Sequence, residues 1–138
     1  MTQRDDINSK PVKLLMKEAG LSATCLEQGL TSLRRANFMQ KWHYYQAFFL
    51  LTIGIERLLK ITIITISRIE HNKIPNNQEL KNYGHDIENL FAKVSNQINA
   101  KDDFLAKDPI YSSILRACLN LLFESYYSYK LCVFVNNW

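Results

Sequence analysis

The feature that most constrains the fold is a long apolar stretch in the middle of the chain, from about residue 40 to 69. Large apolar side chains recur there at steps of three and four residues, in a row made up of Phe48, Leu51, Ile55, Leu58, Ile66 and Ile69. That spacing is typical of one face of an α-helix. A second row, Phe49, Ile53 and Ile63, predicts that this helix is covered on more than one side and is central to the fold.

Two other interpretations of this stretch have to be weighed. The β-branched run from Ile61 to Ser67 also favours a strand, but no partner strand is visible elsewhere, and burial overrides such propensities. The apolar length also raises the question of a membrane span. Glu56, Arg57 and Lys60 lie at its centre, where hydrocarbon would tolerate them poorly. We therefore predict a core helix and no membrane partner.

Helices are predicted on both sides of this central one. Pro11 at a first turn begins a helix over residues 10–38, after a polar start, residues 1–8, that we expect to be disordered. Gly20 suits a C-cap and Ser22 an N-cap, so this first helix is either continuous or split in two.

The second half of the chain begins with a loop and then returns to helical patterns. Asn-rich sequence with Pro75 predicts a loop from about Glu70 to Gly84. A helix over 85–99 follows, with the clearest apolar period of the chain, carried by Ile87, Leu90, Phe91, Val94 and Ile98. Asp108 before Pro109 predicts the start of a last helix over 109–135.

These elements predict an all-α fold, a four-helix up-down bundle in one domain over residues 1–138. A chain of 138 residues can bury a full core, and 4 Gly and 3 Pro leave little punctuation for a many-turned β-fold. Three separated cysteines indicate neither a disulfide framework nor a zinc site. The early charges exclude a signal peptide. We expect a soluble, cytoplasmic protein without a cofactor.

Motifs that would carry enzyme chemistry are absent from the sequence. The three histidines, His43, His71 and His85, lie in different segments, and none forms a spaced pair with another metal ligand. The chain has no glycine-rich phosphate loop and no nucleophile elbow. A net charge of +4 permits an acidic partner without requiring one. The sequence therefore favours a non-catalytic protein over an enzyme.

Two polar clusters stand out against the apolar pattern. Glu56 and Lys60 are spaced i to i+4 in the most apolar helix, where charged groups are costly unless they are paired or reach solvent. His85 and Asp86 follow Gly84 at the head of the next helix, where a carboxylate complements the helix dipole. We predict that Glu56 and Lys60 meet His85 or Asp86, and we take these four residues as a candidate binding site.

The segments 44–47, 55–60 and 84–90, in this order and separated by a polar loop, resemble the HEPN domain (higher eukaryotes and prokaryotes nucleotide-binding). In that family a helix ending in Glu-x-x-Leu-Lys is followed, after a loop, by His-Asp-Leu. The likeness covers about residues 25–130. It implies a four-helix bundle, commonly assembled as a homodimer.

The ribonucleases of that family carry an Arg followed within a few residues by a His, and this chain departs from the pattern. No His follows Arg116 in the last predicted helix, and seven residues separate Arg35 from His43. Without an imidazole there is no evident proton-transfer group near neutral pH. The resemblance thus supports the fold and argues against cleavage.

Three functions remain open. The leading hypothesis is a non-catalytic, HEPN-like binding or adaptor module in a process linked to nucleic acid, nucleotides or a toxin and antitoxin pair. The alternatives are a divergent, metal-independent RNase or nucleotide-handling enzyme, using His43 or His85 with Arg34 or Arg35, and a structural interaction scaffold. We also expect a homodimer whose interface draws on an aromatic cluster of the last predicted helix, formed by Phe123, Tyr126, Tyr127, Tyr129 and Phe134.

Overall fold

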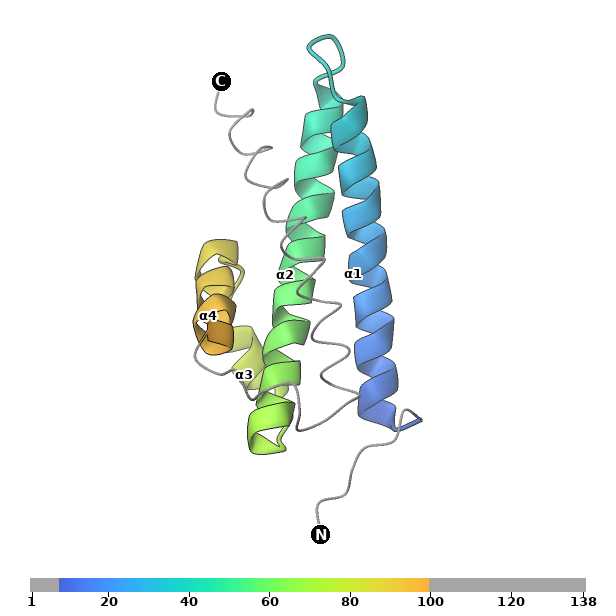
Figure 1. Cartoon of the computed structure of the whole chain (residues 1–138). Coiled ribbons are helices and arrows are strands. Elements are labelled where there is room, and N and C mark those ends of the chain that lie inside the picture. Colours follow the sequence, from blue (N-terminus) through green and yellow to red (C-terminus); the bar gives the residue numbers. More distant parts are fainter. Residues whose placement is uncertain (1–7, 100–138) are drawn as a thin grey trace.

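The computed structural model of the chain describes residues 8–99. These residues form four helices, which are α1 (Lys10–Arg35), α2 (Trp42–His71), α3 (Asn77–Asn82) and α4 (Ile87–Asn99). The long helices α1 and α2 lie side by side as a hairpin, and α4 packs against the other side of α2 (Figure 1). The predicted all-α class is confirmed, and α2 is the central element. The two apolar rows predicted for it are buried over most of their length, but Phe48 and Phe49 are exposed, so the prediction is wrong at these two residues.

The first helix is continuous, so the unbroken helix is the correct one of the two alternatives left open at Gly20. Ser22 is buried, and its hydroxyl donates to the Glu18 carbonyl at 2.9 Å within the same helix instead of capping a new one. The helix ends at Arg35 rather than at residue 38. There the side chain of Asn37 accepts hydrogen bonds from the amides of Met39 and Gln40, which closes a tight turn into α2.

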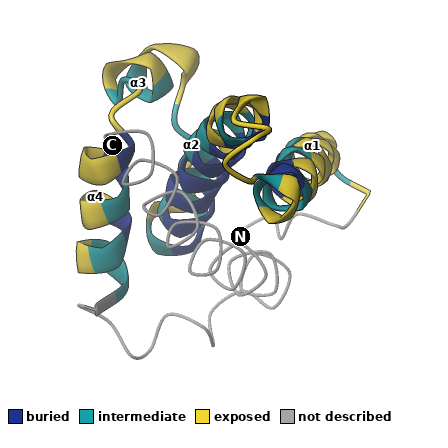
Figure 2. Ribbon diagram, turned by 90° about the horizontal axis from the view of Figure 1, so that it is seen from above, coloured by how far each residue is buried: buried dark blue, intermediate teal, exposed yellow. Residues whose placement is uncertain are grey.

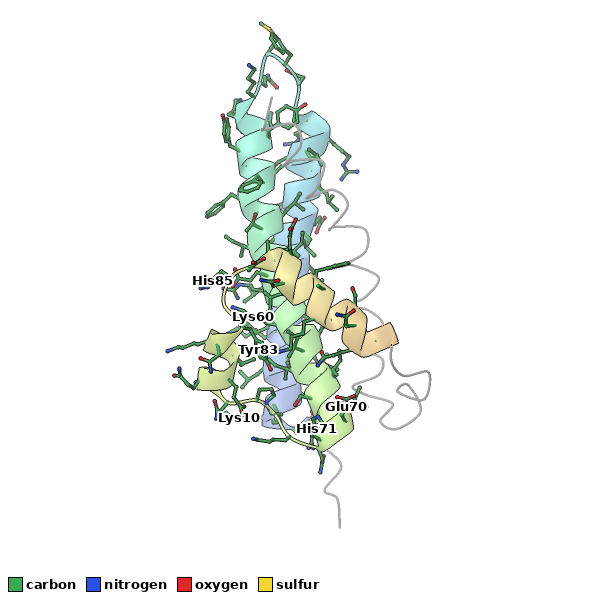
Figure 3. All side chains as sticks on the ribbon, turned by 90° about the vertical axis from the view of Figure 1, so that its left-hand side faces the viewer. Lys10, Lys60, Glu70, His71, Tyr83 and His85 are labelled. Atoms are coloured by element: carbon green, nitrogen blue, oxygen red, sulfur yellow. The ribbon has the colours of Figure 1, made fainter. Side chains whose placement is uncertain are left out.

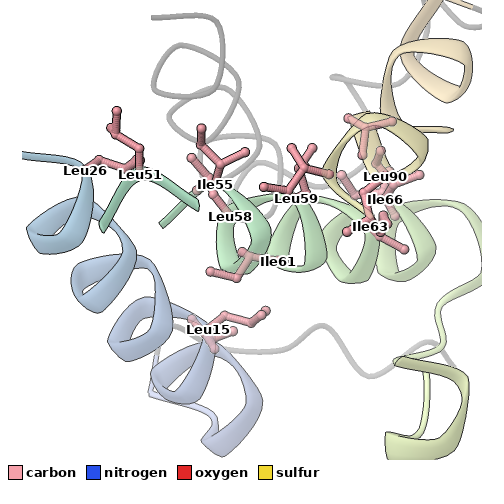
Figure 4. Packing of buried hydrophobic residues seen from close by; sticks show 14 of the residues in the cluster. Leu15, Leu26, Leu51, Ile55, Leu58, Leu59, Ile61, Ile63, Ile66 and Leu90 are labelled. Atoms are coloured by element: carbon pink, nitrogen blue, oxygen red, sulfur yellow. The ribbon is translucent and has the colours of Figure 1, made fainter. Parts of the chain in front are cut away.

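The β-branched part of α2 is helical, as predicted. Thr62 and Thr65 are fully buried, and their hydroxyls donate to the Leu58 and Ile61 carbonyls at 2.8 Å each. Each buried hydroxyl therefore has a partner inside the helix, which removes the cost of burying it. Around them the apolar side chains of α2 form the centre of the core, shown in Figure 4 and by the dark band along α2 in Figure 2.

Two glycines let α1 and α2 approach closely. A Cβ atom built on Gly54 would lie 2.7 Å from Leu26 Cδ2, and one built on Gly29 would lie 2.8 Å from Leu51 Cγ. Each helix thus places a leucine over a glycine of the other, and both leucines are buried. Only a residue without a side chain fits at either position without displacing its neighbour.

A short helix, α3, occupies part of the segment that was predicted to be a loop, so that prediction is wrong at Asn77–Asn82. Its start is a capping box. The Asn76 side chain accepts from the Glu79 amide at 2.9 Å, and the Glu79 carboxylate accepts from the Asn76 amide at 2.8 Å. Two otherwise unsatisfied amides are paired in this way, which stabilises a helix too short to persist by propensity alone.

Helix α4 begins at Ile87, two residues later than predicted, and buries the predicted face. Ile87, Leu90 and Val94 are buried against α2, while Phe91 and Ile98 are half-buried at the edge of the same cluster. Within residues 8–99, no helix combines the length and apolar character needed to cross a membrane. Three predictions involve residues outside the described range and stay predictions. They are the disordered start over residues 1–8, the helix over 109–135 and the single domain over residues 1–138.

Candidate functional site

The predicted contact between the two polar clusters is confirmed. Glu56 Oε1 lies 2.8 Å from Lys60 Nζ, one turn further along α2, and 2.8 Å from His85 Nδ1, which comes from the segment between α3 and α4. One carboxylate oxygen therefore joins a lysine of its own helix to a histidine 29 residues away in the chain. Figure 3 shows Lys60 and His85 next to each other on this side of the molecule.

The backbone around His85 explains how it reaches α2. Gly84 has a φ of 67°, a left-handed conformation that favours glycine, and its amide donates to the Lys81 carbonyl at 3.0 Å. The chain therefore turns sharply between α3 and α4 and presents His85 toward α2. The imidazole stays largely open to solvent, with 84% of the side chain exposed, so only one ring edge is engaged by Glu56.

Asp86 has a different role from the one predicted for the cluster. Its carboxylate accepts hydrogen bonds from the Asn89 amide at 3.1 Å and from the Asn89 side chain at 2.8 Å. This is the N-cap arrangement, in which a side chain satisfies an amide of the first helical turn. Asp86 therefore fixes the start of α4.

Electrostatics keeps the Glu56 carboxylate ionised. Burial would by itself raise the pKa of Glu56, but the hydrogen bonds from Lys60 and His85, together with the charges of these two groups, outweigh burial and lower the pKa below its ordinary value of 4.5. At neutral pH Glu56 is thus a fixed negative charge that orients Lys60 and His85.

The cluster borders an open cleft of about 510 Å³ between α2 and α3. Its lining consists of Lys60, Asn77, Leu80, Lys81 and His85. Sequence reasoning missed Lys81, Asn77 and Leu80, because the segment that carries them was interpreted as a loop. The capping-box pattern, Asn76 followed three residues later by Glu79, is the signal that could have revealed α3 and its side chains.

A second cleft, of about 420 Å³, lies between the C-terminal half of α1 and the start of α2. Its lining includes Glu27, Arg35, Trp42 and His43. The His43 ring stacks on the Trp42 ring, with centroids 3.5 Å apart, and its buried Nδ1 has no hydrogen-bond partner. Of the predicted pairs of a histidine with Arg34 or Arg35, the structure thus places His43 and Arg35 at a common cleft.

The third histidine lines neither cleft. His71 is exposed at the end of α2, 3.5 Å from the Glu70 carboxylate. The predicted interface residues Phe123, Tyr126, Tyr127, Tyr129 and Phe134 lie outside the described residues. In residues 8–99, no three His, Cys, Asp or Glu side chains come together closely enough to hold a metal ion.

No protein-family model, no curated protein and no solved structure matches the chain. What can be said of function therefore rests on the two clefts and on the residues that line them.

Proposed function

We propose that the chain is a non-catalytic, HEPN-like binding module that holds a phosphate group of a nucleotide or nucleic acid in the cleft between α2 and α3. The observation that carries this proposal is the convergence of Lys60, Lys81 and His85 on that cleft. Two ammonium groups and an imidazole facing one space form an electropositive surface, and phosphate is a ligand that such donors bind strongly.

The pairing with Glu56 is compatible with anion binding. An ammonium group has three N–H donors, and Glu56 accepts only one hydrogen bond from Lys60. When both ring nitrogens of His85 carry a proton, Nδ1 donates to Glu56 and Nε2 is left to donate to a ligand anion. The carboxylate therefore fixes the two donors in place and reduces the freedom they would lose when an anion arrives.

The other two lining residues suit the remainder of a nucleotide. Leu80 offers apolar surface to a base or sugar, and the Asn77 side chain can both donate and accept hydrogen bonds. The resemblance of segments 55–60 and 84–90 to the HEPN motifs adds support, since both motifs meet at this cleft. We include in the proposal a homodimer formed through the predicted helix over 109–135.

Binding is tested by titrating the full chain with ATP and with a fluorescent single-stranded RNA. We expect Lys81→Glu and His85→Ala to weaken binding about tenfold, because each removes a charge-assisted hydrogen bond. Lys17→Glu makes the same change of charge at an exposed position of α1, away from the cleft. It should reduce affinity much less than Lys81→Glu does, and only at low salt. Binding that is equally sensitive to all three variants would indicate a diffuse charge effect and would contradict the cleft.

The second candidate function is RNA cleavage, and one observation favours it: His43 and Arg35 border the same cleft. An imidazole could transfer the proton while a guanidinium holds the phosphate. We nevertheless expect purified protein to leave RNA intact, because His43 is buried and packed on Trp42. The check is an assay on labelled RNA. Cleavage that survives purification and disappears in His43→Ala but not in His85→Ala would establish the enzyme.

The dimer is tested separately by light scattering at micromolar concentration. We expect Tyr127→Asp and Phe134→Asp to shift the protein from dimer to monomer, since a buried unpaired carboxylate is costly at an interface. Tyr45→Asp, an exposed aromatic on α2, is the matched control and should leave the mass unchanged. A wild type that is monomeric throughout would contradict the dimer. No binding of ATP or RNA, combined with a stable dimer, would favour a structural scaffold.

A further inference from the structure

The turn between α1 and α2 carries an exposed apolar surface at the end of the hairpin, away from α3 and α4 (Figure 1). Phe38 and Met39, inside the turn, are 80% and 87% exposed. Trp42, the first residue of α2, is also exposed, and Tyr45 and Phe49 follow it at helical spacing on the same face. We call these five residues the tip patch. Five exposed large apolar side chains gathered at one end of the hairpin are of the kind that marks a site of interaction.

Cations surround the tip patch. Arg34 and Arg35 end α1, and Lys41 precedes α2 with its ammonium 4.8 Å from the centre of the Phe38 ring. The sequence contains no Asp or Glu between residues 28 and 55. The partner that complements this end of the molecule is therefore anionic and offers an apolar layer next to its charges.

Four backbone amides at the tip are already paired within the turn. The amides of Met39 and Gln40 donate to the Asn37 side chain at 3.0 and 2.9 Å, and the amides of His43 and Tyr44 donate to the Gln40 and Lys41 carbonyls. Amides paired in this way can leave water at little cost. These four amides can therefore approach an apolar environment without losing a hydrogen bond.

We propose that the tip patch docks on the surface of an anionic phospholipid bilayer. Phe38 and Met39 enter the interfacial region, Trp42 lies at the level of the headgroups, and Arg34, Arg35 and Lys41 contact lipid phosphates. Such docking differs from a membrane span. The charges inside α2 excluded a span and were the ground for expecting no membrane partner, but they place no limit on contact through the turn.

The composition of the tip favours lipid over unpaired bases. A single strand stacks its bases on flat aromatic rings. The most exposed apolar side chain of the tip is that of Met39, which has no ring, and it lies beside Phe38 at the far end of the hairpin. A bilayer interface accepts an unbranched thioether and aromatic rings alike, so it fits the whole patch.

The test is flotation of the full chain with vesicles of phosphatidylcholine, alone or with phosphatidylserine as roughly a third of the lipid. We expect binding to the mixed vesicles and a loss of about tenfold or more in the double variant Phe38→Ser, Met39→Ser. Lys41→Glu should lower binding at least about fivefold, since each cation near an anionic surface contributes that much. The matched control is Leu14→Ser, Met16→Ser, two exposed apolar residues on α1, which should bind as wild type does.

A second readout places the tip in the lipid. The chain has two tryptophans, and Trp138→Phe leaves Trp42 as the reporter. We expect its emission to shift to the blue on adding mixed vesicles and to stay unchanged with phosphatidylcholine alone.

Three results would overturn the proposal. The first is no flotation, and the second is flotation that the tip and control variants reduce equally. The third is that the chain does not bind vesicles but does bind a single-stranded oligonucleotide or a second copy of itself, and that the tip variants abolish this binding. That result would assign the patch to the other partner. None of these results bears on the cleft between α2 and α3, which has its own variants.

Discussion

The two sides of α2 differ in kind. Toward α1 the contact is a close, largely apolar interface in which leucines lie over Gly29 and Gly54. Toward α3 and α4 the same helix presents Glu56 and Lys60, and they meet His85 beside an open cleft. One side holds the hairpin together, and the other combines the apolar contact with α4 and a charged cluster that we propose binds a ligand. We therefore expect substitutions at the two glycines to affect stability most and substitutions of the cations at the cleft to affect binding most.

The largest expected effect is on the α1 side. Gly54→Ala should lower the free energy of unfolding by about 1 to 3 kcal/mol, because the added Cβ overlaps Leu26 and approaches the Ser22 carbonyl. Gly20→Ala is the matched control, since a Cβ there meets nothing within 4 Å. It should instead stabilise by about 0.5 to 1 kcal/mol, through the higher helix propensity of alanine. Urea unfolding followed by circular dichroism measures both. Equal effects at the two glycines would contradict the close contact.

A smaller effect is expected for Glu56→Gln. The pKa of Glu56 is lowered in the folded protein, so its ionised form contributes stability that is present above the ordinary value of 4.5 and is lost as the pH falls through the lowered value. At neutral pH the loss should be about 1 to 2 kcal/mol, as for hydrogen bonds to a charged group. The gap between wild type and variant should close in acid.

Glu18→Gln provides the comparison for that experiment. It removes the ion pair with Arg57, joined at 2.7 Å but about half exposed on both sides, and such pairs contribute little. At neutral pH the free energy of unfolding should therefore fall clearly for Glu56→Gln and by almost nothing for Glu18→Gln. The gap for Glu56→Gln should narrow as the pH falls. A gap for Glu56→Gln that widens in acid would contradict the assigned direction of the pKa.

The smallest expected effect is that of Asp86→Ala. Loss of an N-cap costs about 0.5 to 1 kcal/mol when the site is exposed, and Asp86 caps α4 through Asn89. Affinity for ATP should stay at the wild-type level, in contrast to His85→Ala. A loss of affinity as large as that of His85→Ala would return Asp86 to the binding site.

Buried faces and the pairing of charges in an apolar helix could be predicted from the sequence, whereas close contacts between two helices could not. The apolar periods of α2 and α4 predicted buried faces, because burial repeats with the helical turn and can be recognised without knowing the partner. The contact of Glu56 with His85 was also predicted, because charges in an apolar helix need a partner. The close contact between Gly54 and Leu26 could not be predicted from the sequence around either residue, because it depends on how α1 and α2 pack against each other.

What the sequence left open or predicted wrongly also has local causes. Gly20 and Ser22 are typical of helix caps, so a split first helix could not be excluded from the sequence, whereas the burial of Ser22 fits a continuous α1. The Asn-rich segment after α2 looked like a loop because the capping box at Asn76 and Glu79 was overlooked. Without α3, Lys81 could not be placed at the cleft, although it is one of the two lysines that line it.

The most direct test of the binding site is a titration of isotope-labelled full chain with ADP, followed by NMR of the backbone amides and of the His85 side chain. We expect the largest shifts at Lys60, Lys81 and His85, small shifts along the α1 face of α2, and loss of the shifts in Lys81→Glu. Two results would contradict a phosphate site between α2 and α3. One is shifts centred on His43 and Arg35, and the other is no shifts at ADP concentrations at which a separate titration shows saturated binding.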